Sequence, residues 1–388
     1  MEKEIETLHK YFTVTFNQYN SDNNYLYSTY INGVGEYQLR YKTNDLYDAN
    51  LFLEKLYNKH NFCNHITFKK FYEYIIEAIY YNHKNIQVIK NKIINPKKFI
   101  IFKEIFGVEV VESASFGDFT IYNLDKCREF LEKKYENYSE KFKNLEKNIY
   151  LIKTEYESSK GEVALANADI KINEFINSLY YIYDSQYINP TCNKYESTSL
   201  VNFAFSENTY CEVSTSKLQT SINLDLIISK MQDNEILTKL IKIITSTSNN
   251  ELENLIKDAV NWIGESIKDN NPSTSLLKAV ISLETLLSFS EGQITPSIMH
   301  TICEASAFIL GNDFETRLKI EKNIKKIYST RSSITHSGKK EKIINIEKKY
   351  IISIVKSIIN TLLSDKFLDC KNKKELMDKI KKIKYGTL

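Results

Sequence analysis

Apolar residues recur at intervals of three and four from about residue 246 to the end of the chain, which is the period of amphipathic helices. Breaks in this pattern lie at Asn270–Pro272, at Gly292 and at Pro296. The pattern therefore predicts a compact all-α bundle over residues 245–388. Its predicted helices cover residues 249–267, 275–290, 297–311, 315–333 and 348–365, followed by a basic helix in the tail.

Strand and helix patterns alternate over residues 107–240, which predicts an α+β module. Turn residues separate short runs rich in β-branched and aromatic residues from longer amphipathic stretches. The expected elements are a hairpin around Gly117, a helix over residues 125–145, a strand over 149–158, a long helix over 161–184 and strands over 199–206 and 209–216.

Residues 1–106 are expected to form a mixed β/helical region. Tyr- and Thr-rich runs between residues 11 and 42, separated by SDNN and NGVG turns, predict a small β-meander. Residues 46–106 have the spacing of helices. The chain as a whole is thus expected to be an α+β protein whose last part is all-α.

Charge is distributed unevenly, although the net charge is only +3. Residues 317–350 hold eleven Lys or Arg and three acidic residues, and residues 366–388 hold eight Lys and three acidic residues. These two stretches carry +13 together, residues 351–365 balance, and residues 1–316 carry −10. A basic end on an acidic body suits a polyanion such as a nucleic acid, whereas solvated helix faces would need no partner.

The six cysteines lie far apart and none forms a CxxC motif. The start MEKEIETLHK lacks the basic and then apolar run of a secretory signal, and no stretch reaches the roughly 18 apolar residues of a membrane span. We therefore expect reduced thiols, a cytoplasmic location and no membrane partner.

One charged residue interrupts the apolar stripe of the helix predicted over residues 315–333. The stripe runs through Ile320, Ile324 and Ile327, and the next position on this face is Arg331. A charge directed towards the interior needs a partner or a function, unless its stem packs and its head reaches solvent. Arg331 is therefore a candidate site residue, with simple packing as the alternative.

His336 follows five positions after Arg331. Five helical steps turn about 500°, so a straight helix directs the two side chains about 140° apart. Gly338 could cap the helix and let its last turn unwind near His336, or a two-fold dimer could bring two such pairs together. Glu284 lies beside an apolar helix face and is expected to pair with a cation. Arg331 is the candidate partner, and a structural ion pair or an exposed position at the stripe's edge is the alternative.

Other motifs are weaker indications of a functional site. His60, Cys63 and His65 offer zinc ligands, but no fourth ligand is evident nearby except His83, so a helix terminus is the simpler interpretation. The sequence lacks a P-loop and the GxGxxG, HExxH and GxSxG motifs. No cofactor and no metal are expected.

Residues 246–345 resemble the Apea-like branch of the HEPN superfamily. The matching stretches are IKDAVNWIGESI, LLKAVISLETLLSF, EASAFILG and IKKIYSTRSSITHSG. Residues 108–183 also resemble the α+β segment that precedes HEPN domains, through FGDFTIYNL and ALANADIKINEFINSLYYI.

The resemblance implies an Arg-x4–6-His site, usually in a dimer, which many members use to cleave RNA without a metal in toxin or anti-phage defence. The matching residues are Arg331 and His336, with Ser332 and Glu284 expected to orient the site. The expected partners are RNA, a second copy of the chain, and an antitoxin or phage-derived trigger. The alternative is a non-catalytic HEPN module that dimerises or binds a partner or a nucleotide.

Overall fold

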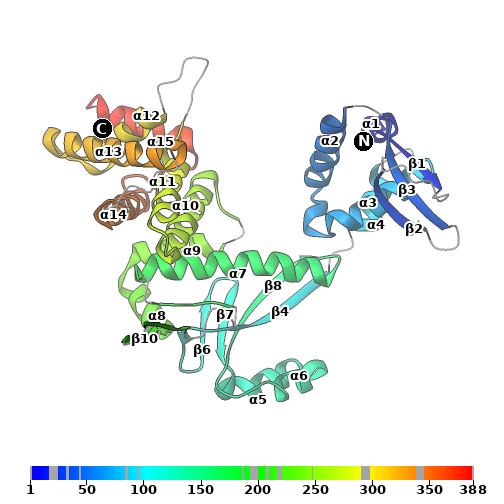
Figure 1. Ribbon diagram of the computed structural model, residues 1–388, viewed down its shortest axis with the longest axis horizontal. Helices are drawn as coiled ribbons and strands as arrows, with labels where there is room; N and C mark the ends of the chain where they lie inside the picture. Colours follow the sequence, from blue (N-terminus) through cyan, green and yellow to red (C-terminus); the bar gives the residue numbers. More distant parts are fainter. Residues whose placement is uncertain are drawn as a thin grey trace. The chain divides into compact units, whose positions relative to one another are not determined.

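The computed structural model divides the chain into two units, each built from two separate stretches of sequence. Figure 1 labels helices and strands of both units. The smaller unit comprises Met1–Ile101 and Thr154–Ile170, and the larger unit comprises Phe102–Lys153 and Lys171–Leu388. The predicted parts follow sequence order, whereas residues 154–170 of the predicted α+β module belong to the smaller unit. The structure describes residues 2–16, 25–31, 35–42, 45–83, 86–94, 97–185, 188–192, 200–206, 209–215, 221–246, 248–289, 298–337 and 345–386.

The smaller unit begins with helix α1 (Glu2–Tyr11) and a three-stranded antiparallel sheet. Strands β1 (Phe12–Phe16) and β2 (Tyr25–Ile31) both pair with β3 (Gly35–Tyr41), so the order is β1-β3-β2. The three predicted strands are present, but the predicted meander is wrong, because a meander would place the second strand in the centre. Strand pairing between distant segments is not encoded in the local pattern that predicts each strand.

Helices α2 (Leu46–Lys59), α3 (Phe68–Tyr80) and α4 (Ile86–Ile93) follow, with a short 3-10 turn η1 (Phe62–Asn64). The prediction that this region stays helical to its end is wrong, because β4 (Lys97–Ile105) is a strand. Its sequence KKFIIFKEI is rich in Ile and Phe, which favour a pleated, half-buried surface.

His65 connects the end of η1 to the turn that joins β8 (Tyr150–Ser158) to α7 (Gly161–Tyr183). His65 is 8% exposed, and its Nδ1 lies 3.5 Å from the hydroxyl oxygen of Ser159. Its backbone carbonyl accepts a hydrogen bond from Ser158 Oγ at 3.4 Å. Burial lowers the pKa of His65, although the Glu157 carboxylate raises it by a smaller amount.

We expect the smaller unit to lose stability as the pH falls below about 6.5, the ordinary histidine pKa. Because the pKa of His65 is lowered in the folded state, the unfolded chain binds a proton in this window that the folded chain does not. Denaturant unfolding between about pH 8 and pH 5 should therefore depend less on pH in His65→Gln than in the wild type. Burial also lowers the pKa of His9, so some dependence should remain, but equal slopes would contradict the prediction.

A four-stranded sheet of order β4-β8-β7-β6 carries a different core on each face. In β7 (Phe119–Asn123), Ile121 belongs to the core that includes α7 residues, whereas its neighbour Tyr122 packs with residues of α5 (Leu124–Lys134). This is the alternation expected of a strand covered on both faces. Phe175 of α7 stacks on Phe119 with ring centroids 4.8 Å apart.

The hairpin predicted around Gly117 is confirmed, since β6 (Ser113–Phe116) pairs with β7 across it. Gly117 has a φ of +55°, in the left-handed region that favours glycine. The predicted strand over residues 149–158 and helix over 161–184 are also present, as β8 and α7. The single helix expected over residues 125–145 is instead divided into α5, η2 (Glu136–Tyr138) and α6 (Ser139–Lys143).

Two small strand pairs complete the β structure. Strands β9 (Leu200–Ser206) and β10 (Thr209–Thr215), both predicted as strands, form an antiparallel pair. Strand β5 (Val108–Glu109) pairs in parallel with β11 (Ile222–Asn223). Strand β11 leads into two helices that are not expected from the sequence pattern. These helices are α8 (Leu224–Asp233) and α9 (Glu235–Thr245).

The C-terminal part is helical, as predicted, and the first two of its helices begin with side-chain caps. Asn250 and Glu253 form a capping box, and Asn271 caps the next helix, in which Pro272 is the first residue. The helices are α10 (Glu251–Lys268), α11 (Pro272–Leu287), α12 (Ile298–Leu310), α13 (Phe314–Ser337), α14 (Asn345–Leu362) and α15 (Lys373–Lys384).

Small residues let α10 approach its neighbours closely. Ser266 Oγ donates to the carbonyl of Ser275 on α11 at 2.7 Å, and Ser275 Oγ donates back to the carbonyl of Ser266. On the other side of α10, Gly264 lies against α7, where a Cβ would stand 2.1 Å from the carbonyl oxygen of Asn177. Packing at this crossing therefore depends on the absence of a side chain.

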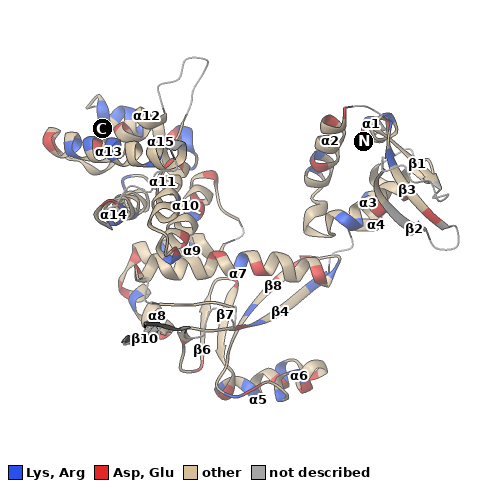
Figure 2. Ribbon diagram, viewed as in Figure 1, with Lys and Arg blue, Asp and Glu red and all other residues tan. Residues whose placement is uncertain are grey.

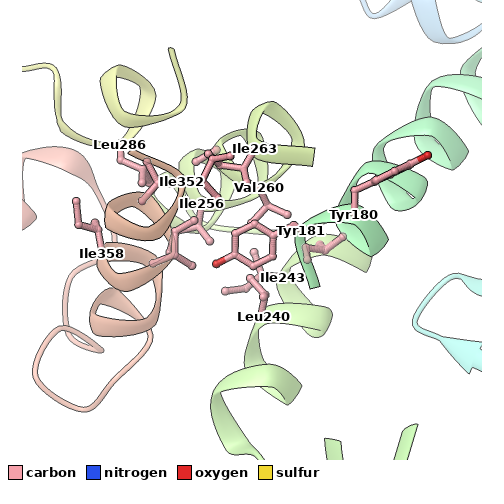
Figure 3. Close-up of a cluster of buried hydrophobic side chains, with 14 of the residues drawn as sticks. Tyr180, Tyr181, Leu240, Ile243, Ile256, Val260, Ile263, Leu286, Ile352 and Ile358 are labelled. Atoms are coloured by element: carbon pink, nitrogen blue, oxygen red, sulfur yellow. The ribbon is translucent and has the colours of Figure 1, made fainter. Parts of the chain in front are cut away.

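One hydrophobic core runs through the larger unit, from the sheet to the last helix. Figure 3 shows side chains from α7, α9, α10, α11 and α14 meeting in it, with Tyr181, Val260 and Ile352 among them. The predicted α+β module and the predicted helical bundle therefore share one core.

Candidate functional site

Helix α13 places Arg331 at the edge of the buried stripe. Ile324 and Ile327 are buried, Ile334 is partly buried against the same core, and Arg331 lies between them. The side chain of Arg331 is 37% exposed, so its stem lies along the core edge while its head reaches solvent. The guanidinium group is therefore accessible to a ligand.

Arg331 and Glu284 are brought together across α13 and α11. The Arg331 Nη2 atom lies 3.8 Å from Glu284 Oε1, and the Glu284 side chain is 23% exposed. The pairing expected from the sequence is thus present in the structure. Because both side chains are partly exposed, the pair is worth little to stability by itself, but it does restrict the direction of the guanidinium fork.

Tyr328, one turn before Arg331, is a neighbour that the sequence analysis does not single out. It is 8% exposed, and its buried hydroxyl makes no hydrogen bond of ordinary geometry within the described ranges. Burial raises the pKa of Tyr328 far above its ordinary value, and the Glu284 carboxylate beside the hydroxyl raises it further. In the sequence, Tyr328 is an aromatic residue beside the apolar stripe, which by itself does not indicate a role in the site.

A second carboxylate, that of Glu347, contacts the same turn of α13 from another helix. Glu347, in the first turn of α14, lies 3.1 Å from Lys326 Nζ and accepts a hydrogen bond from Thr330 Oγ1 at 3.3 Å. Its side chain is mostly buried. The segment Lys326–Arg331 is therefore fixed from α11 and from α14.

Ser332 is exposed on α13, next to Arg331 in sequence. Its backbone carbonyl accepts a hydrogen bond from Thr335 Oγ1 at 3.1 Å. With Lys322, Lys325 and Ser329, which are also exposed, Ser332 occupies one face of the helix at spacings of three and four. Four residues further, the position of His336 falls on the same face.

His336 lies within the continuous part of α13, which remains helical to Ser337. The unwinding of the last turn near His336, one of the two arrangements considered from the sequence, is therefore not found. Gly338 and the His336 side chain lie outside the described part of the structure. A continuous helix places the two positions about 140° apart around its axis, so one copy of α13 does not direct both towards one point.

Basic residues are frequent on α13 and α15, as Figure 2 shows. Helix α15 packs on the bundle through Leu376 and Ile380, which are buried, and Lys384 pairs with Glu304 of α12. Helix α15 therefore belongs to the bundle, and Lys374, Lys381 and Lys382 are exposed on its remaining faces.

Within the described residues, no three His, Cys, Asp or Glu side chains are grouped so as to hold a metal ion. His60 instead pairs with Glu4 at 3.2 Å, and Cys63 contacts Asn64. Among the helices that the structure describes, none is both long and apolar enough to cross a membrane.

Comparisons with known protein families, with curated proteins and with solved structures give no match to this chain.

Proposed function

We propose that the C-terminal bundle is a metal-independent HEPN-type endoribonuclease, acting in toxin or anti-phage defence. The observation that carries the proposal is the half-exposed Arg331, held by Glu284 on a helix with a basic, exposed face. Solvent access allows the guanidinium group to meet a phosphate, which a fully buried arginine could not do.

The chemistry follows from the residue types. RNA carries its own nucleophile, the 2′-hydroxyl, and a histidine near neutral pKa can remove its proton or protonate the leaving 5′-oxygen. Arg331 binds two phosphate oxygens and stabilises the charge that develops in the transition state. The product is a 2′,3′-cyclic phosphate, and DNA, which lacks the 2′-hydroxyl, is not cleaved.

The proposed active site contains two copies of the chain. Because α13 is continuous through His336, the arginine of one copy and the histidine of a second are the simplest pair that can meet at one phosphate. Ser332 and Glu284 orient the site. The α+β elements of the larger unit would select the RNA or respond to an antitoxin or a phage-derived trigger.

The direct test incubates the purified wild type, Arg331→Ala and His336→Ala with total RNA in the presence of EDTA. We expect cleavage by the wild type alone, with losses of about 10²–10⁴-fold in the variants and cyclic phosphate ends on the products. A DNA oligonucleotide of the same sequence is the matched control. Equal cleavage by all three proteins would show that this site is not responsible.

The alternative is a non-catalytic module in which Arg331 and Glu284 form a structural ion pair. The pair itself favours this alternative, since each charge already has a partner. The alternative predicts that none of the three proteins cleaves RNA, with or without a trigger.

A further inference from the structure

Tyr328 carries a polar atom that packing alone does not require. It follows the buried Ile324 and Ile327 on α13, and a phenylalanine ring would fill the same space. Buried hydroxyls are normally hydrogen-bonded, because burying one without a partner is unfavourable. In the described part of the chain the Tyr328 hydroxyl lacks such a bond, and its polar neighbour is the carboxylate of Glu284.

The three side chains Tyr328, Glu284 and Arg331 form a series that runs from the core to the solvent. Tyr328 is 8% exposed, the Glu284 side chain 23% and the Arg331 side chain 37%. Tyr328 and Arg331 are three residues apart and therefore lie on the same side of α13, where both face α11. One carboxylate thus has a buried phenol on its inner side and a guanidinium group on its outer side.

We propose that Tyr328 is a positioning residue, whose hydroxyl restrains the Glu284 carboxylate and thereby fixes the direction of the Arg331 guanidinium group. A hydrogen bond from the phenol to one carboxylate oxygen would leave the other oxygen for the arginine. The Arg331 fork is then held in one orientation before the transition state forms, which removes part of the cost of ordering it there. The consequence for cleavage rests on the proposed ribonuclease function, but the restraint itself does not.

The restraint is tested first without RNA. The chain contains four arginines, so the Nε–H signal of Arg331 can be assigned in ¹⁵N-arginine-labelled protein by comparison with Arg331→Lys. We expect Tyr328→Phe to shift and broaden this signal, and we expect Glu284→Gln to do the same. The double variant Tyr328→Phe, Glu284→Gln should show no further change relative to Glu284→Gln alone. Tyr350→Phe, which removes a phenol on α14 that packs against the same core, is the matched control and should leave the signal unchanged.

An unchanged Arg331 signal in folded Tyr328→Phe protein would overturn the proposal. A reciprocal measurement is available if Tyr328→Phe does not fold. Glu284→Gln should shift the ring signal of Tyr328 in ¹³C-tyrosine-labelled protein. The absence of this shift would equally overturn the proposal.

RNA cleavage then distinguishes a positioning role of Tyr328 from a purely structural one. With an active wild type, Tyr328→Phe should lower kcat by about 10- to 100-fold, as misplacement of a binding group does, while KM and the unfolding midpoint stay near their wild-type values. Unchanged kcat would overturn the positioning role. An inactive wild type would contradict the proposed function, whereas the NMR result would still decide the restraint.

Discussion

Co-expression of Arg331→Ala with His336→Ala is expected to restore RNA cleavage to about one quarter of the wild-type level, although each variant alone is inactive. The reason is the continuous α13, which separates the two positions by about 140°. If each site takes its arginine from one copy and its histidine from the other, a mixed dimer retains one complete site of two. Random pairing makes about half of the dimers mixed.

The measurement is the initial rate of cleavage per subunit in EDTA, with the two variants carrying different affinity tags so that mixed dimers can be isolated. The control co-expresses the wild type with an Arg331→Ala, His336→Ala double variant. Every mixed dimer then lacks one residue in each of its two sites, so the rate per wild-type subunit should fall by about half, which is about one quarter of the wild-type rate per total subunit. An unchanged rate per wild-type subunit in this control, together with no recovery in the first mixture, would show that both residues act within one copy.

Substitution of Gly264 by alanine is expected to destabilise the larger unit by about 1–3 kcal/mol or more. In a helix interior the change would by itself stabilise by about 1 kcal/mol. Here, however, the new Cβ would stand 2.1 Å from the Asn177 carbonyl oxygen and 2.5 Å from its carbon, and backbone atoms cannot rotate away. The separation of α7 and α10 would also disturb the Asn177 side chain, which donates to Asn261 at 2.8 Å and to Glu265 at 2.7 Å.

Denaturant unfolding of the full chain, followed by hydrogen exchange in α7 and α10, measures this loss. Gly161→Ala is the matched control, because its Cβ would meet only the ring of Phe99 at 3.4 Å, an ordinary contact. A Gly264→Ala protein as stable as the wild type would mean that the two helices do not approach as closely as described.

The helices α10 to α15 could be predicted because apolar periodicity, Asn caps and Pro breaks agree along this part of the chain. The local pattern did not distinguish β4 from a helix, since a nine-residue run rich in Ile and Phe fits either. It also gave no information on strand order, because the pairing of β1 with β3 joins residues that are far apart in sequence.

The same limit applies to the candidate site. Arg331 and Glu284 could be predicted because each places a charge beside an apolar stripe. Tyr328 reads as an ordinary core aromatic, and its polar neighbour comes from another helix. Glu347 reaches Thr330 only through the packing of α14 on α13, which no local pattern specifies.

The smaller unit takes its last segment, Thr154–Ile170, from beyond the start of the larger one. A fragment that ends at residue 106 would therefore lack Ser158 and Ser159, the partners of His65. During synthesis, the first hundred residues must also wait until residue 170 has left the ribosome before their unit has all of its chain. Folding of the two units is thus interleaved in time, and neither can be obtained by a single cut in the chain.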